Sequence, residues 1–183
     1  MIKKSLFLFL SAGLSFVSPA QITNNEMSPA ESFAARKGTI LEKRFDQIGK
    51  VGYLNIQIEY LSDLSTNEKI QCVRFDIQQV NTASGPSVLL DSNEVNEIIS
   101  FLKYISSNII TRPPVDPNTE ISFTSKYNIG VGCFWQGSNN WTLFIRADAQ
   151  NPATETDIAK PDIAALLKTL RLAKSELADY KQQ

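Results

Sequence analysis

Two amphipathic helices with matching residue spacing constrain the fold of this chain more than any other feature. Asp91 and Glu94 are spaced as a capping box, so the first helix is predicted to begin there. Its apolar residues form one stripe at helical spacing: Val95, Ile98, Ile99, Leu102, Ile105 and Ile109. Sixty-eight residues later the same spacing returns in Ile163, Leu166, Leu167, Leu170, Ala173 and Leu177. Pro161 stands at a favourable first-turn position of this second helix.

Alternating strands precede each helix, so the two halves share more than a helical rhythm. In the first half the predicted strands are "TILEKRFDQI" (39–48), "YLNIQIEYL" (53–61), "KIQCVRFDIQQ" (69–79) and "SVLL" (87–90). In the second half they are "YNIGVGCFW" (127–135) and "NWTLFIRADA" (140–149). The link "TRPPVDPN" (111–118) separates the halves, because its prolines disfavour both a helix and a central strand.

We therefore predict an α+β fold of two tandem β-β-(β)-α repeats, 38–110 and 115–179, within one domain that spans 38–183. Each repeat is expected to form an antiparallel sheet with one helix packed on its apolar face. This order of strands and a helix, given twice, resembles in outline the paired repeats of the PUR-alpha and Whirly single-stranded nucleic-acid binders. In those families the open sheets present aromatic side chains to bases. The resemblance implies the architecture and not the activity.

The amino terminus has the pattern of a secretory signal peptide. Lys3 and Lys4 precede the apolar run "SLFLFLSAGLSFV", and Ser18-Pro19-Ala20 ends it with small residues at the positions that a signal peptidase reads. The run is too short for a membrane span. We therefore expect cleavage after residue 20, export to the periplasm or beyond the cell, and no membrane anchor in the mature chain. Residues 21–37 are expected to be a lead-in segment with a short helix after Ser28.

Charge argues against nucleic acid as a partner. The chain has 18 basic and 19 acidic residues, and loss of the signal peptide lowers the net charge to about −3. Nucleic-acid binders draw much of their affinity from clustered Lys and Arg side chains, and no such cluster exists in this sequence. We therefore expect no nucleic-acid partner.

The two cysteines are predicted to remain free thiols. Val73, Phe75 and Ile77 alternate toward the core, which places Cys72 on the opposite face of its strand. Cys133 belongs to the inward-facing set of its own strand. Because one thiol faces inward and the other outward, a disulfide bond is not expected.

The outer faces of the two sheets differ in character. The first carries polar residues that water can solvate: Gln57, Glu59, Arg74, Asp76 and Gln78. On the second, Phe134 and Phe144 point outward together if the hairpin loop has an odd number of residues. A three-residue loop places the two rings directly opposite each other, whereas a five-residue loop places Phe144 over Gly132.

Three interpretations of this second outer face remain open at this point. Phe144 shields a glycine, or the other half of the chain covers the face. Alternatively, the face binds a protein or glycan partner through Phe134, Phe144, Arg146 and Lys126. The third interpretation is a catalytic site.

The absence of histidine restricts the chemistry. Ser-His-Asp and Cys-His mechanisms are excluded, as are imidazole metal sites. No G-x-S-x-G elbow, phosphate-binding loop or C-x-x-C pair occurs, so no catalytic residue, metal ligand or cofactor is predicted. The sequence favours an exported, non-enzymatic binding or interaction module, and its oligomeric state is not predicted. The alternative is a histidine-free hydrolase that uses paired carboxylates on glycans.

Overall fold

Two four-stranded antiparallel sheets and their helices make up the protein. The computed structural model describes residues 26–78, 85–136 and 140–180, so the predicted signal peptide lies outside the described residues. The first sheet has the order β1 (Leu41–Val51), β2 (Leu54–Asp63), β3 (Lys69–Ile77) and β4 (Ser87–Leu90). The second has the order β5 (Asn118–Thr124), β6 (Gly130–Gln136), β7 (Trp141–Arg146) and β8 (Glu155–Ile158).

A long helix follows each sheet, which confirms the predicted pair of units. The helices are α2 (Ser92–Tyr104), which continues as the π-helical turn Ile105–Ile109, and α3 (Ile163–Tyr180). The short helix α1 (Pro29–Ala34) precedes the first sheet, and two 3-10 turns flank β8 at Pro152–Thr154 and Lys160–Asp162. The strands β5 and β8 were not predicted, and they complete the second sheet to four strands.

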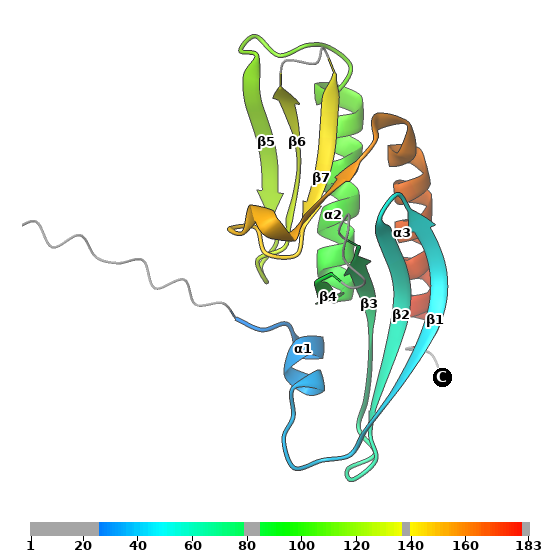
Figure 1. Ribbon diagram of the computed structural model, residues 1–183. Coiled ribbons are helices and arrows are strands. Elements are labelled where there is room, and N and C mark those ends of the chain that lie inside the picture. Colours follow the sequence, from blue (N-terminus) through cyan, green and yellow to red (C-terminus); the bar gives the residue numbers. More distant parts are fainter. Residues whose placement is uncertain (1–25, 79–84, 137–139, 181–183) are drawn as a thin grey trace, which may run out of the picture.

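The two helices exchange sheets. The final helix, α3, packs across β1, β2 and β3 of the first sheet, where Gln71 donates a hydrogen bond from Nε2 to the carbonyl oxygen of Leu177 at 2.7 Å. Helix α2 lies behind β7 in Figure 1, and its Phe101 stacks on Phe123 of β5 at 5.6 Å between ring centroids. The first sheet is thus covered by a helix from the other unit, whereas α2 contacts both the second sheet and strands β3 and β4 of its own sheet.

One continuous core results from this exchange. The apolar stripe of α2, the stripe of α3 and the inward residues of both sheets belong to a single buried cluster. The helices α2 and α3 also contact each other within it. The predicted capping box is present at the start of α2, where Asp91 accepts hydrogen bonds from the backbone of Asn93 at 2.7 Å and of Glu94 at 2.9 Å.

Helix α1 docks on the outer face of the first sheet, which corrects the expectation that this face is solvated. Ala30 and Phe33 pack against Leu61, Cys72 and Leu89 in a second, smaller cluster. The predicted cap at the helix start is confirmed by a capping box at Ser28. The Ser28 hydroxyl also donates a hydrogen bond to the carbonyl oxygen of Leu89 in β4 at 3.1 Å.

Glu59 shows the consequence of this docking. Its side chain is fully buried, with Arg74 Nη1 at 3.0 Å and Lys43 Nζ at 3.5 Å from its carboxylate oxygens. Buried charges require such partners, because leaving water costs an ionised group its hydration. The sequence pattern placed Glu59 on the correct face and predicted the short helix after Ser28, but it did not predict that this helix docks on that face.

Both cysteines are free thiols, as predicted, and both are buried, Cys72 in the cluster with Ala30 and Phe33 of α1. Burial raises the pKa of the Cys72 thiol to about 12 and that of the Cys133 thiol to about 11. Within the described part of the chain, no helix is long and apolar enough to cross a membrane.

Candidate functional site

The hairpin of β6 and β7 establishes the outer face of the second sheet. Trp135 pairs with Trp141 and Gly132 with Phe144, which is the register of the longer of the two predicted loops. A methyl group at Gly132 would overlap the ring of Phe144 and would lie 2.7 Å from the carbonyl oxygen of Ile121. Glycine is therefore required here, because the ring of Phe144 occupies the space of a side chain at this position.

Phe144 is fully buried although it lies on the outer face. The ring of Phe134 stacks on it at a centroid distance of 6.2 Å, and the guanidinium of Arg146 lies 4.0 Å from its ring centroid. Phe144 consequently supports the surface from beneath and has no exposed area with which to contact a partner. The interpretation in which it shields a glycine describes its position correctly.

Arg146 lies between two carboxylates. Its Nε is 2.5 Å from Glu155 Oε2, and its Nη1 is 3.3 Å from Glu120 Oε1. Partial burial acts to lower the pKa of the Arg146 guanidinium, but the hydrogen bonds and negative charges of Glu155 and Glu120 outweigh burial and raise it. The guanidinium is thus permanently charged, and its three-residue cluster carries a net charge of −1 with both glutamates ionised.

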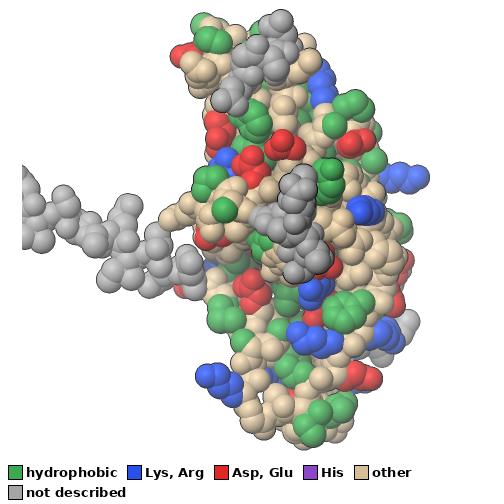
Figure 2. Space-filling model, in the orientation of Figure 1, with side chains coloured by type: hydrophobic (Ala, Val, Ile, Leu, Met, Phe, Trp, Pro, Cys, Tyr) green, Lys and Arg blue, Asp and Glu red, His purple; other side chains and the backbone are tan. Residues whose placement is uncertain are grey.

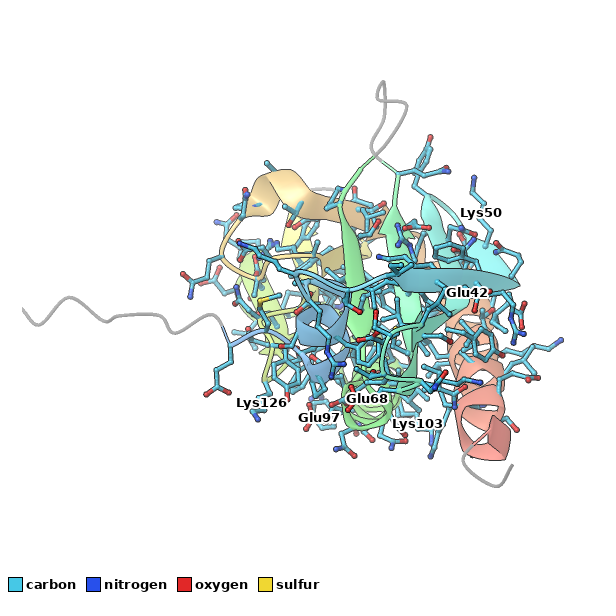
Figure 3. The ribbon with its side chains drawn as sticks, turned by 90° about the horizontal axis from the view of Figure 1, so that it is seen from below. Glu42, Lys50, Glu68, Glu97, Lys103 and Lys126 are labelled. Atoms are coloured by element: carbon cyan, nitrogen blue, oxygen red, sulfur yellow. The ribbon has the colours of Figure 1, made fainter. Side chains whose placement is uncertain are left out.

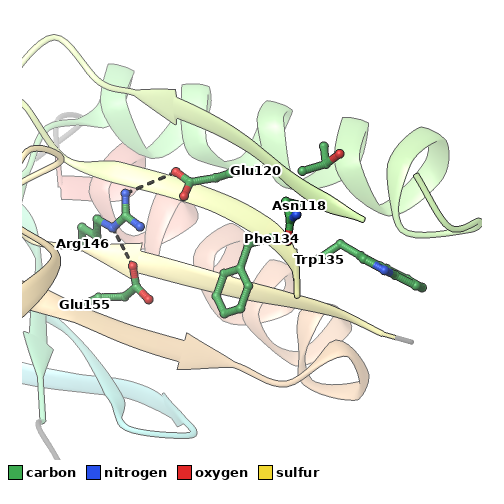
Figure 4. Close-up of a pocket in the computed structure, with 7 residues that line it drawn as sticks. Asn118, Glu120, Phe134, Trp135, Arg146 and Glu155 are labelled. Atoms are coloured by element: carbon green, nitrogen blue, oxygen red, sulfur yellow. Dashed lines mark hydrogen bonds and ion pairs between the residues drawn. The ribbon is translucent and has the colours of Figure 1, made fainter. Parts of the chain in front are cut away.

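An open hollow of about 340 Å³ lies beside this cluster. It is lined by Asn118, Thr119, Glu120, Phe134, Trp135, Arg146 and Glu155 (Figure 4). We call this set the β5–β8 hollow. Trp135 forms one end of it and packs edge-on against Trp141, whose Nε1 donates to the carbonyl oxygen of Arg112 at 2.9 Å. The hollow therefore has an aromatic wall that is held in place and a charged floor whose groups are mutually paired.

Three of the four residues predicted for a ligand surface lie together, and the fourth does not. Phe134, Phe144 and Arg146 contact one another on this face. Lys126 follows β5 in the turn before β6 and lines a different hollow with Glu97 and Tyr127, near the start of α2 (Figure 3). Its side chain is 64% exposed and lies 3.7 Å from Glu26 Oε2.

The sequence reasoning missed the remaining lining residues of the β5–β8 hollow. Asn118 and Glu120 come from β5, and Glu155 comes from β8, the two strands that were not predicted. A usable signal existed for β5, since "TEISF" alternates between polar and apolar residues immediately after the proline-rich link. For β8 the four residues "ETDI" are too short to give a comparable pattern.

Comparison with known proteins gives no assignment, since no protein-family model and no curated protein matches this chain. The chemistry of the hollow must therefore carry the functional argument. In the described part of the chain, no group of three or more His, Cys, Asp or Glu residues is placed to hold a metal ion. On the face drawn in Figure 2, acidic and basic side chains are interspersed and no large region carries one sign.

Proposed function

We propose that this chain is an exported, non-enzymatic binding module that holds a neutral, hydroxyl-rich ligand, such as a glycan, in the β5–β8 hollow. The observation that carries the proposal is the arrangement of Arg146. Its charge is already paired with Glu120 and Glu155, beside the partly exposed aromatic ring of Phe134. Export rests on the signal-peptide pattern of residues 1–20.

Charge pairing selects against an anionic ligand. A site for phosphate or carboxylate presents unpaired arginine or lysine donors to the ligand. In the β5–β8 hollow the one guanidinium binds two glutamates, so an anion would meet a cluster of net negative charge. A neutral ligand avoids this repulsion and still finds carboxylate acceptors for its hydroxyl groups.

The lining supplies both kinds of contact that a sugar ring requires. Phe134 and Trp135 offer apolar surface for the C–H side of a ring, and Asn118 and Thr119 on the neighbouring strand β5 offer an amide and a hydroxyl. A hollow that combines aromatic surface with a few convergent polar groups is typical of a small-molecule site.

A carboxylate hydrolase is the second candidate, because two glutamates line the same hollow. Such an enzyme needs two carboxyl groups on opposite sides of the bond that it cleaves. Glu120 and Glu155 instead bind the same guanidinium, which occupies the position between them (Figure 4). This arrangement supports binding more than hydrolysis.

The first prediction concerns Phe134 and is measured with neutral and anionic oligosaccharides by calorimetry. We expect a neutral oligosaccharide to bind, and Phe134→Ala to weaken its binding roughly 10- to 100-fold, because a phenylalanine contact is lost. Phe45→Ala is the matched control, since Phe45 is an exposed phenylalanine beside Arg74 on the first sheet. We expect no change in this control.

Three results would argue against the proposal. The hollow is not the site if Phe134→Ala binds as the wild type does, and an anionic preference would contradict the charge argument. Release of new reducing ends, abolished by Glu155→Gln, would establish the hydrolase instead.

A further inference from the structure

Strand β5 differs from the other three edge strands of the two sheets. Strand β1, at one edge of the first sheet, carries five charged residues and a bulge between Gln47 and Gly49. Figure 3 shows two of its charged side chains, Glu42 and Lys50. Strands β4 and β8 are only four residues long. Charges, bulges and short length are the usual devices that prevent one sheet edge from pairing with another.

Strand β5 has no bulge and only one charged residue. It is seven residues long, pairs with β6 in unbroken register, and contains no lysine, arginine or proline. Its one charged residue, Glu120, is engaged with Arg146. Among the residues that the structure describes, no strand pairs with the other edge of β5. Apart from the Asn118 N–H, which donates to Asp116 Oδ1 at 2.9 Å, its outer row of backbone donors and acceptors is therefore available to another strand.

The apolar side chains beneath this edge are incompletely covered. Ile121 and Phe123 point from β5 toward the core, and Phe101 of α2 stacks beneath Phe123. All three are only partly buried, in contrast to the fully buried Val131 and Cys133 one strand further in. A second strand placed beside β5 would cover this apolar rim as well as satisfy the backbone.

The sequence of β5 is complementary to itself. In an antiparallel pair centred on Ile121, Glu120 faces Ser122, Thr119 faces Phe123 and Asn118 faces Thr124 of the other copy. The single negative charge of each strand then meets a hydroxyl group and not a like charge, and like charges placed directly opposite would be destabilising. Polar residues face polar residues on the outer side, and Ile121 meets its own copy on the inner side.

We propose that the protein is a homodimer in which β5 pairs antiparallel with β5 of a second copy, joining the two second sheets into one of eight strands. The two-fold axis is perpendicular to the joined sheet, because opposed residues in this register lie on the same face. Both α2 helices then lie on one side, and both β5–β8 hollows open on the other. The interface is isologous, so it closes with two copies and does not propagate.

The test uses the purified full chain and its mass in solution, measured by sedimentation equilibrium over a wide concentration range without ligand. The wild type is expected to be a dimer. The variant Asn118→Lys with Thr124→Lys places two lysine pairs across the interface, and its Kd is expected to rise about tenfold or more. The variant Asn118→Lys with Thr124→Glu places opposite charges at the same two positions, and it is expected to restore the dimer.

Both positions on β5 are exposed, so neither variant alters the core. Ser175→Lys with Ala178→Lys adds the same charge on the exposed face of α3 and is expected to leave the dimer intact. A chain that remains monomeric up to about 1 mM would overturn the proposal. A chain whose β5 pairs only with a foreign peptide would overturn it as well. A dimer that is indifferent to the lysine pairs would overturn it also. Because mass is measured without ligand, the result does not depend on the proposed function.

Discussion

At the scale of single residues, Gly132 and Phe144 act as one unit. The missing side chain of Gly132 leaves space on β6, and the ring of Phe144 on β7 fills it. The filled space then gives Phe134 and Arg146 a flat apolar base. Gly132, which has no side chain, thus allows Phe144 to form the base of the β5–β8 hollow.

The second prediction follows from this packing. Gly132→Ala is expected to lower the free energy of unfolding by about 1–3 kcal/mol, as overpacking of a filled site does. The added methyl group has little room to relax, because the carbonyl oxygen of Ile121 is 2.7 Å from its ideal position. Adding Phe144→Leu to Gly132→Ala removes the overlap with the ring and should recover part of the loss. Urea unfolding measures both, and an unchanged midpoint for Gly132→Ala would refute this account.

The inward or outward direction of most strand side chains was predictable from the sequence. The burial of outward side chains was not, for one physical reason. Alternation along β6 correctly placed Val131 and Cys133 inside and Phe134 outside. Alternation also placed Glu59 on the outer side of β2, but periodicity cannot reveal that a distant segment covers that side. The burial of Glu59 depends on α1, which is docked through Phe33 from a separate part of the chain.

At the scale of elements, capping residues predicted helix starts more reliably than alternation predicted strands. Ser28 and Asp91 both form the capping boxes that their sequences indicate. The reason is that a cap is a local interaction within four residues, whereas a short strand depends on its neighbours. Strands β5 and β8 form because β6 and β7 offer open edges for pairing, and this information lies elsewhere in the sequence.

The third prediction concerns the start of α2. Asp91→Ala is expected to lower the free energy of unfolding by about 1 kcal/mol, because two backbone donors of the first turn lose their acceptor. Asn93→Ala is the control, since Asn93 is exposed and caps neither donor. Thermal unfolding by circular dichroism compares the two variants. Equal stability of the two would show that the cap contributes nothing beyond helix propensity.

At the scale of the whole molecule, the two units are inseparable. The first sheet buries its apolar face against α3 of the other unit, α2 contacts both sheets, and one cluster includes residues from both units. The fold class and the duplication were predictable from the sequence. The exchange was not, because the same helix stripe fits either sheet and periodicity carries no information about which sheet it meets.

The fourth prediction is that neither half folds alone. Residues 26–114 lack α3, which packs on β1, β2 and β3, and residues 115–183 lack α2, whose Phe101 stacks on Phe123 of β5, so each fragment would expose apolar sheet surface. We expect both fragments to give collapsed amide spectra by NMR when separate and a dispersed spectrum when mixed. As a control, the intact protein cleaved at a protease site inserted in the 111–117 link should remain one particle on gel filtration. A dispersed spectrum from either half by itself would contradict the prediction.

The exchange of helices also sets a temporal order on biogenesis. The first sheet is finished only by α3, so a ribosome must release almost the entire polypeptide before the earliest strands find their cover. This delay would suit a precursor that crosses a membrane as an unfolded chain. Under the proposed export, the chain would stay unfolded during synthesis and would acquire its final shape only after its last segment had crossed the membrane.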